Sequence, residues 1–292
     1  MSRRARRLFG VPLAFQWMRT RGLRIERVRN ESVQGEWIVP QSPEKGEILY
    51  VHGGGFVACS AATHRPITAG LARLSGRRVF SVDYRLAPEH RFPAALDDVV
   101  EAYRWLLEQG VSPSSLTLAG DSAGGGLVLS TLVRVRDIGL PLPASALCFS
   151  PWTDLAGSSE LSLLNDGRCA MFHPENVVEF AKAYLGDISP MDPCASPVFA
   201  DLGGLPPILL QVGSTELLLD DARRIHQKVQ SAGGVSRLDI FDDVCHGWQM
   251  LDGLLPEARL ALTQAAEFIK GAVDCQSAVA SEIDALRETT AG

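Results

Sequence analysis

Residues 116–126 read LTLAGDSAGGG, in which an apolar run is followed directly by a cluster of small residues. The apolar part is typical of a buried strand, and residues 124–137 then have the pattern of a helix. Between the two, Gly120-Asp121-Ser122-Ala123-Gly124 matches G-x-S-x-G. In a strand–turn–helix setting, small neighbours allow the sharp turn that lifts the serine hydroxyl clear of the sheet. The stretch therefore predicts that Ser122 is a nucleophile in an α/β fold.

A second glycine-rich turn, His52-Gly53-Gly54-Gly55-Phe56, follows the apolar run of residues 48–51. Successive glycines let backbone N–H groups approach a substrate without obstruction by a Cβ atom. In acyl transfer such donors stabilise the oxygen that becomes negative in the tetrahedral intermediate. A phosphate-binding loop is less well supported, because no Lys-Ser/Thr pair follows. We predict that His52 orients the loop and that the oxyanion hole consists of the N–H groups of Gly53, Gly54 and Ala123.

The order of residues in this type of fold requires an acid and then a histidine after the nucleophile. Of the later histidines, His173 lies in an irregular region and His226 within a helical pattern, whereas His246 follows a predicted strand in a loop. We therefore predict that His246 is the base. Glu216, in the turn beyond another predicted strand, is the favoured acid, and Asp220, one helical turn later, is the alternative.

Short apolar runs alternate with longer amphipathic stretches, which predicts an α/β fold with a mainly parallel sheet flanked by helices. The strands are predicted at residues 36–39, 47–52, 78–84, 115–120, 144–149, 207–212 and 236–241. The helices between them are predicted at residues 61–74, 94–109, 124–137, 217–231 and 256–270.

This alternation is interrupted once, between residues 155 and 205. The interval has a helical patch at residues 175–184 and loops with Pro and Gly, but no run typical of a buried strand. We interpret it as a cap insertion that divides the catalytic domain into residues 41–154 and 206–292, a natural position for a lid. Residues 1–40 are expected to form an N-terminal cap segment and the first strand region.

The composition argues against several classes of protein. The 292 residues are 46% hydrophobic and 21% charged, which is typical of a globular protein. The net charge of -6 argues against nucleic acid as a partner, because phosphate binding needs a basic surface. No apolar run approaches the ~20 residues of a membrane span. Six scattered cysteines without a C-x-x-C pair predict reduced thiols in a cytoplasmic protein and no metal site.

The charge is unevenly distributed, because residues 1–30 hold nine arginines and one acid. The apolar stretch at residues 8–18 is interrupted by Pro12 and Gln16 and is not followed by a small-x-small cleavage site. This favours an amphipathic helix covering the active site over a signal peptide. Weak contact of the basic N-terminus with a membrane or lipid interface, in addition to catalysis, stays open.

These residues together resemble the hormone-sensitive-lipase-like esterases, the bacterial family IV carboxylesterases, over about residues 47–253. Besides HGGGF and GDSAGG, the stretches DYRLAPEHRFPAA (83–95), SPWTDL (150–155) and LPP (205–207) fit this family. The resemblance implies an α/β-hydrolase domain with a helical cap, no cofactor, and hydrolysis of short- to medium-chain acyl esters through a Ser-His-acid triad and an acyl-enzyme. The family usually has Asp at the position of Glu216.

Two other functions stay open. The same site would suit an amidase, an arylformamidase or a sugar deacetylase. A non-catalytic ligand receptor with this fold would usually lack the nucleophile or the base, and this sequence has both Ser122 and His246. The sequence therefore favours an enzyme acting on a small-molecule ester, and it leaves open whether the protein is a homodimer.

Overall fold

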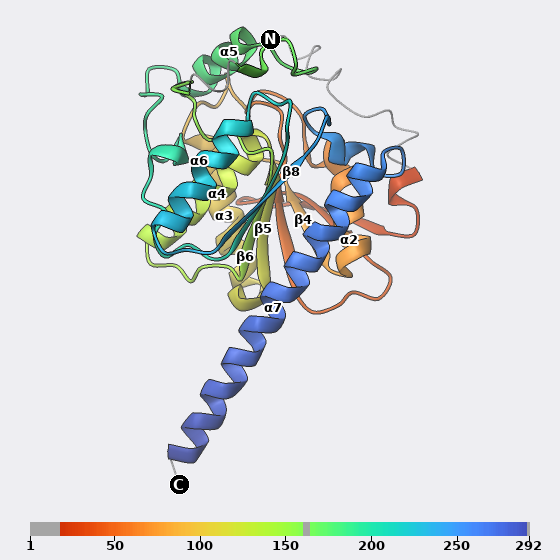
Figure 1. Ribbon diagram of the computed structural model, residues 1–292. Helices are drawn as coiled ribbons and strands as arrows, with labels where there is room; N and C mark the ends of the chain where they lie inside the picture. Colours follow the sequence, from red (N-terminus) through yellow and green to blue (C-terminus); the bar gives the residue numbers. More distant parts are fainter. Residues whose placement is uncertain (1–17, 160–163, 291–292) are drawn as a thin grey trace.

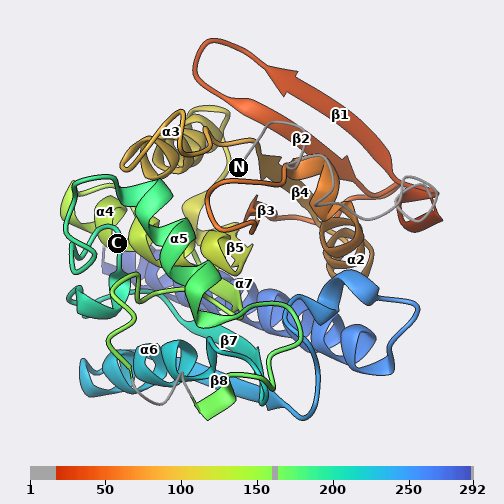
Figure 2. The ribbon, with the colours of Figure 1, turned by 90° about the horizontal axis from the view of Figure 1, so that it is seen from above.

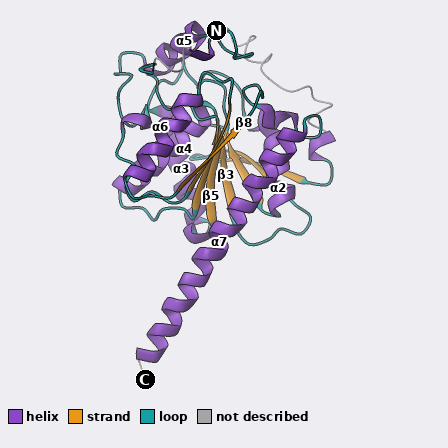
Figure 3. Cartoon of the chain, viewed as in Figure 1, coloured by secondary structure: helices purple, strands orange, loops and turns teal. Residues whose placement is uncertain are grey.

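The structure, a computed structural model, describes residues 18–159 and 164–290, with side chains through residue 273. In this part of the chain, one eight-stranded sheet lies between layers of helices (Figures 1 and 3). The strands, in their order across the sheet, are β1 (Arg24–Arg29), β2 (Gln34–Val39), β4 (Arg78–Val82), β3 (Glu47–Val51), β5 (Leu116–Asp121), β6 (Ser145–Phe149), β7 (Ile208–Gly213) and β8 (Ser236–Phe241).

The strands from β4 to β8 in this order are all parallel, whereas β2 pairs antiparallel with β4 and β1 antiparallel with β2. The central strands are buried on both faces, as parallel strands covered by helices must be. In β3, for example, Ile48 and Tyr50 belong to one core cluster, and Leu49 and Val51 belong to the other. This explains why the strand is continuously apolar in the sequence.

Helices cover both faces of the sheet (Figure 2). One face is covered by α2 (Arg65–Ser75) and α7 (Pro256–Thr290), whose residues Leu71 and Leu262 share a core cluster with Ile48. The other face is covered by α3 (Ala94–Glu108), α4 (Ala123–Asp137) and α6 (Leu219–Ser231). Short 3-10 helices in the described chain are η2 (Ala61–His64), η3 (Pro113–Ser115), η5 (Pro197–Phe199) and η6 (Trp248–Leu251).

The predicted fold class is confirmed, and each predicted strand is found with its ends shifted by at most two residues. Two elements differ from the prediction. The strand β1 was not predicted, because its sequence RIERVR places four charged side chains in an exposed edge strand. The helix α7 does not end at Lys270 but continues to Thr290, away from the body of the molecule (Figure 1). Residues 272–290 contain no proline, and a single glycine at position 271 costs a helix only ~1 kcal/mol.

Residues 155–205, the predicted cap insertion, contain η5 and α5 (Pro174–Leu185) and have no strand in their described part. Helix α5 lies at the top of the molecule in Figure 1, above the sheet.

The predicted N-terminal helix falls almost entirely on residues 1–17, outside the described residues. None of the helices in the described chain has both the length and the apolar character of a membrane span. Within the part of the chain that the structure describes, the cysteines with free thiols are Cys59, Cys148, Cys169, Cys194 and Cys245.

Candidate active site

Ser122 lies between the end of β5 and the start of α4, with backbone angles φ 54° and ψ -124°. A positive φ is unfavourable for a residue with a side chain and is found mostly at turns and functional sites. The backbone of Ser122 is fixed on both sides, because its N–H donates to Phe149 O (2.8 Å) and its carbonyl accepts from Gly126 N and Trp152 N. This is the strand–turn–helix setting that the sequence predicts for a nucleophile.

The glycines that follow Ser122 are required by close packing. A Cβ atom at Gly124 would collide with the carbonyl oxygen of Val51, and one at Gly126 would collide with that of Trp152. Larger residues would push α4 away from the end of β3 and from the loop after β6. The G-x-S-x-G pattern therefore reflects contact between backbones as well as the turn itself.

The predicted base and acid are in direct contact. His246 Nδ1 lies 2.5 Å from Glu216 Oε2, and both side chains are buried. The other carboxylate oxygen of Glu216 accepts hydrogen bonds from the Ser150 hydroxyl and the Gly213 N–H, each at 2.7 Å. Since an ionised carboxylate only accepts hydrogen bonds, His246 Nδ1 donates in this contact, and Nε2 is then the unprotonated nitrogen of the neutral imidazole.

The loops that carry these two residues are joined to each other. The Thr215 hydroxyl donates to Val244 O (3.1 Å), and the Ser214 N–H donates to Phe241 O (2.8 Å). The Asp243 N–H in turn donates to the Ser214 hydroxyl (3.1 Å). These bonds hold the loop after β7 against the loop after β8 and so keep Glu216 beside His246.

The alternative acid, Asp220, does not contact His246. It lines a second, smaller cavity on the other side of Glu216. Its neighbour Asp221 accepts hydrogen bonds from the N–H groups of Thr153 and Asp154, which ties α6 to the loop after β6. Burial, together with the charge of Asp154, raises the pKa of Asp221 to about 7, although the hydrogen bonds lower it.

The pKa of His246 is raised above its usual value of 6.5. Burial lowers this pKa, but the charge of Glu216 and its hydrogen bond raise it further than burial lowers it, and the charge of Asp121 adds to the increase. The site therefore stabilises a protonated imidazole, which is the species that a general base becomes after it takes a proton.

The glycine loop is arranged differently from the prediction at one position. The N–H of Gly53 donates to Asp121 Oδ1 (3.0 Å) and does not face the cavity, which is lined instead by Gly54 and Gly55. In the described chain, no acceptor takes the N–H groups of Gly54, Gly55 or Ala123. His52 stacks on Tyr84 with ring centroids 4.2 Å apart, and its Nδ1 lies 2.7 Å from Gly53 O, so its ring does brace the loop.

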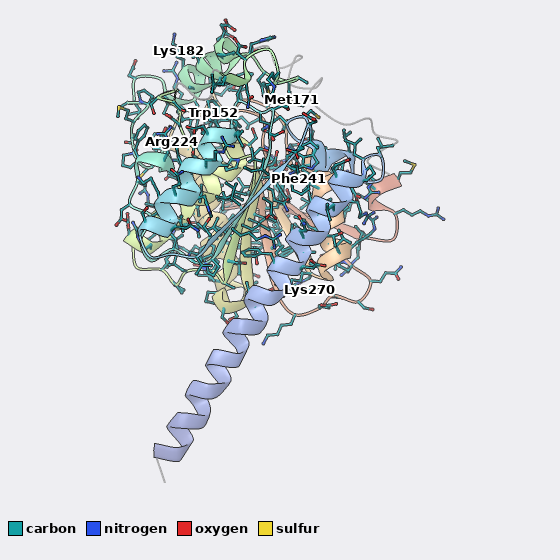
Figure 4. The ribbon with its side chains drawn as sticks, in the orientation of Figure 1. Trp152, Met171, Lys182, Arg224, Phe241 and Lys270 are labelled. Carbon is teal, nitrogen blue, oxygen red and sulfur yellow. The ribbon has the colours of Figure 1, made fainter. Side chains whose placement is uncertain are left out.

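These residues surround a cavity of about 430 Å³, lined by Ser122, His246 and Glu216 and otherwise mostly by apolar side chains. Trp152 and Met171, two of its lining residues, both lie in the upper part of the molecule (Figure 4). In the described chain, no lysine or arginine lines this cavity. No group of three or more His, Cys, Asp or Glu side chains in the described residues is arranged to hold a metal ion.

The cap contributes aromatic side chains that the sequence did not single out. Phe172 packs edge-on against the His246 ring, with centroids 5.1 Å apart, and Phe180 lies over Gly55, where an added Cβ would be 3.1 Å from its ring. Farther along α5, Tyr184 stacks on Phe56 at 3.8 Å. The glycine loop is thus packed directly against α5. An aromatic pair at positions 172 and 180 has no distinctive sequence pattern, so only the structure reveals it.

The chain is similar to known α/β hydrolases and esterases. Residues 48–250 match a family described as having the alpha/beta hydrolase fold. An acetyl-hydrolase of Streptomyces hygroscopicus is 41% identical over 237 residues, which cover 81% of this chain and 79% of that protein. An esterase of Acinetobacter venetianus is 38% identical over 247 residues, covering 84% and 82% of the two chains. The crystal structure of an esterase from the bacterial hormone-sensitive lipase family has a TM-score of 0.86 and 42% identity, covering 92% of this chain and 90% of that one.

The chain therefore belongs to the α/β-hydrolase family. Within it, the protein belongs to the bacterial hormone-sensitive-lipase group and is a hydrolase of the carboxylic-ester class. The family and enzyme class predicted from the sequence are confirmed.

Removing the acid separates the two candidates for that role. Glu216→Ala leaves the buried His246 without its partner, so we expect kcat to fall by roughly 10³- to 10⁴-fold, as for other triad acids. Asp220→Ala serves as the matched control and should leave kcat close to that of the wild type. Steady-state hydrolysis of p-nitrophenyl butyrate measures both variants, and a larger loss for Asp220→Ala would assign the acid to Asp220.

The raised pKa of His246 predicts the pH dependence of activity. A general base acts when neutral, so kcat/KM should be lost as pH falls through the pKa of His246 in the free enzyme, with a midpoint above 6.5. Glu216→Gln removes the charge that favours the protonated imidazole while burial remains. In a pH–rate profile we expect this variant to shift the midpoint downward, and an unchanged midpoint would contradict the assignment.

Proposed function

We propose that the protein hydrolyses carboxylic esters by two-step acyl transfer, with Ser122 as nucleophile, His246 as general base and Glu216 as the acid that orients it. The observation that carries this proposal is the 2.5 Å contact between His246 Nδ1 and Glu216 Oε2 at the wall of the cavity that Ser122 also lines. The contact supports a general base because it leaves the other ring nitrogen of His246 free to accept a proton, in the chain order nucleophile, acid, histidine that this fold uses.

In the first step, Ser122 Oγ attacks the ester carbonyl carbon while His246 Nε2 accepts the hydroxyl proton. The tetrahedral intermediate collapses when His246 gives this proton to the leaving alcohol, and the acyl group remains on Ser122. Water then attacks the acyl-enzyme, with His246 again accepting a proton and returning it to Ser122 Oγ. The products are the alcohol and the carboxylic acid, and the residues end in their initial states.

For the oxyanion hole we revise the set of donors to Gly54, Gly55 and Ala123. Gly54 and Gly55 line the cavity, and Ala123 is the first residue of α4, where an N–H group has no partner within the helix. The N-terminal end of α4 also favours negative charge. Each donor is expected to stabilise the transition state by about 3–4 kcal/mol.

The walls of the cavity support neutral esters as the substrates. The side chains that line it include Val57, Trp152, Val177, Leu218 and Met250, and the charged groups among its lining residues are engaged with protein partners. An anionic substrate would therefore meet no opposite charge among the lining residues described. Together with the cavity volume, this supports short- to medium-chain acyl esters, and the relatives named above are themselves called esterases and acetyl-hydrolases.

Replacing the nucleophile tests the mechanism. Ser122→Ala should lower kcat for p-nitrophenyl butyrate by roughly 10⁶-fold, because no other group forms the acyl-enzyme. The melting temperature should stay near that of the wild type, since Ala fits the same space. A folded variant that hydrolyses the ester at the wild-type rate would exclude Ser122 as the nucleophile.

The cap side chains predict the chain-length preference. Phe180 projects from α5 onto the glycine loop, so Phe180→Ala should enlarge the cavity and shift the optimum in a p-nitrophenyl ester series toward longer acyl chains. Val178 on the same helix is 50% exposed and does not line the cavity. Val178→Ala is therefore the matched control and should leave the profile unchanged. A profile that is identical in both variants would exclude Phe180 as a determinant of chain length.

A further inference from the structure

The residue before the nucleophile, Asp121, has a carboxylate that joins three separate segments. Its Oδ1 atom accepts hydrogen bonds from the Tyr50 hydroxyl (2.7 Å) and the Gly53 N–H (3.0 Å). Its Oδ2 atom lies 3.1 Å from His64 Nε2. Tyr50 belongs to β3, Gly53 to the glycine loop and His64 to η2, so one side chain fixes the positions of all three next to Ser122.

The charged form of Asp121 suits this arrangement. Burial raises the pKa of Asp121, but the charge and hydrogen bond of His64 and the hydrogen bond of Tyr50 together lower it below its usual value. An ionised carboxylate accepts several hydrogen bonds at once and donates none, so all three partners donate to it. The contact with the loop is also tight, since a Cβ atom at Gly53 would collide with Asp121 Oδ2.

The Asp121 carboxylate connects the nucleophile directly to the proposed oxyanion hole. Asp121 is bonded through one peptide to Ser122, and the N–H that it holds is one residue before Gly54. Because the Gly53 N–H is turned toward Asp121, the following residues, Gly54 and Gly55, line the cavity. Gly54 has a φ of 112°, which fixes this change of direction in a conformation that favours glycine.

His64 and Tyr50 in turn hold the carboxylate. His64 is buried, and its second ring nitrogen lies 3.0 Å from the Thr63 hydroxyl, which also bonds to Ser60. Tyr50 is fully buried in β3. Neither residue is needed as a base or an acid in the proposed reaction, and His64 was passed over in the sequence because it precedes the nucleophile.

We infer that Asp121, held by His64 and Tyr50, is a positioning residue that sets the distance between the Gly54 and Gly55 N–H groups and Ser122, and thereby the stabilisation of the oxyanion. This inference rests on the proposed function, because it assumes that Ser122 generates an oxyanion in this cavity. It predicts a loss of transition-state stabilisation with little change in substrate binding.

The experiment compares Asp121→Ala with Asp121→Asn in the full-length enzyme, with kcat normalised to active sites titrated with an organophosphate. For Asp121→Ala we expect kcat to fall about 100-fold, comparable to the loss of one oxyanion donor, with KM nearly unchanged. The inhibition constant of a trifluoromethyl ketone, which forms an oxyanion on the serine, should rise by a similar factor. Asp121→Asn should recover part of the activity, because its amide oxygen can still accept from Gly53.

Single and double variants test the supporting residues. His64→Gln and Tyr50→Phe should each lower kcat in the wild-type background but have little further effect in the Asp121→Ala background, because both act through that carboxylate. Tyr103→Phe is the matched control for Tyr50→Phe, since Tyr103 also donates a buried hydroxyl, to Pro141 O (2.6 Å), but lies outside the site. We expect this control to leave kcat and inhibitor affinity unchanged.

The outcomes separate this inference from the proposed function. Asp121→Ala with wild-type kcat and inhibitor affinity would overturn the positioning role while leaving Ser122 as nucleophile. A higher KM for Asp121→Ala with kcat unchanged would also overturn it. So would a fall in kcat for His64→Gln that is as large in the Asp121→Ala background as in the wild type. If Asp121→Ala does not fold, the His64→Gln and Tyr50→Phe variants provide the same comparison of kcat with inhibitor affinity. Wild-type ester hydrolysis by Ser122→Ala would instead contradict the proposed function itself.

Discussion

The positive φ of Ser122 is the constraint on which the rest of the site depends. A non-glycine residue in such a conformation costs of the order of 1–3 kcal/mol, so the surrounding structure must hold it there. Hydrogen bonds from Trp152 N and Gly126 N to its carbonyl, and from its N–H to Phe149 O, do so. These partners come from β6, the loop after it, and α4, which are themselves fixed by the buried parallel sheet. The fold thus supplies the stability that this turn requires.

The buried strands of this fold could be predicted from the sequence, whereas two exposed elements, β1 and the C-terminal part of α7, could not. The strands β3, β5 and β7 are covered on both faces, so burial selects apolar residues at most of their positions. The edge strand β1 has only a partly covered face, and its six residues include four charged and two apolar ones, without the apolar run or strict alternation that indicates a strand. The extension of α7 beyond Lys270 lies away from the sheet, where no core periodicity marks its end.

Some features of the candidate site could likewise be proposed from the sequence, and others could not. Ser122, Glu216 and His246 could be proposed from the sequence because each follows a strand whose apolar run is visible, and the structure places all three around one cavity. The direction of individual N–H groups could not be read from HGGGF, since three glycines allow many conformations and the contact with Asp121 is distant in sequence. The packing of Phe172 on His246 depends on how the cap folds over the sheet, which no local pattern encodes.

The surroundings of Glu216 show how the carboxylate of a glutamate is placed beside His246. Compared with aspartate, the extra methylene, ~1.5 Å, would carry the carboxylate too far if the side chain extended straight toward His246. Instead Oε1 turns back to the Gly213 N–H and the Ser150 hydroxyl, and Oε2 alone meets the imidazole. Position 213 must remain small, because a Cβ atom there would lie 2.7 Å from Val244 O and 3.0 Å from Glu216 Oε1. The two carboxylate oxygens of Glu216 thus have separate partners, the loop donors on one side and the imidazole on the other.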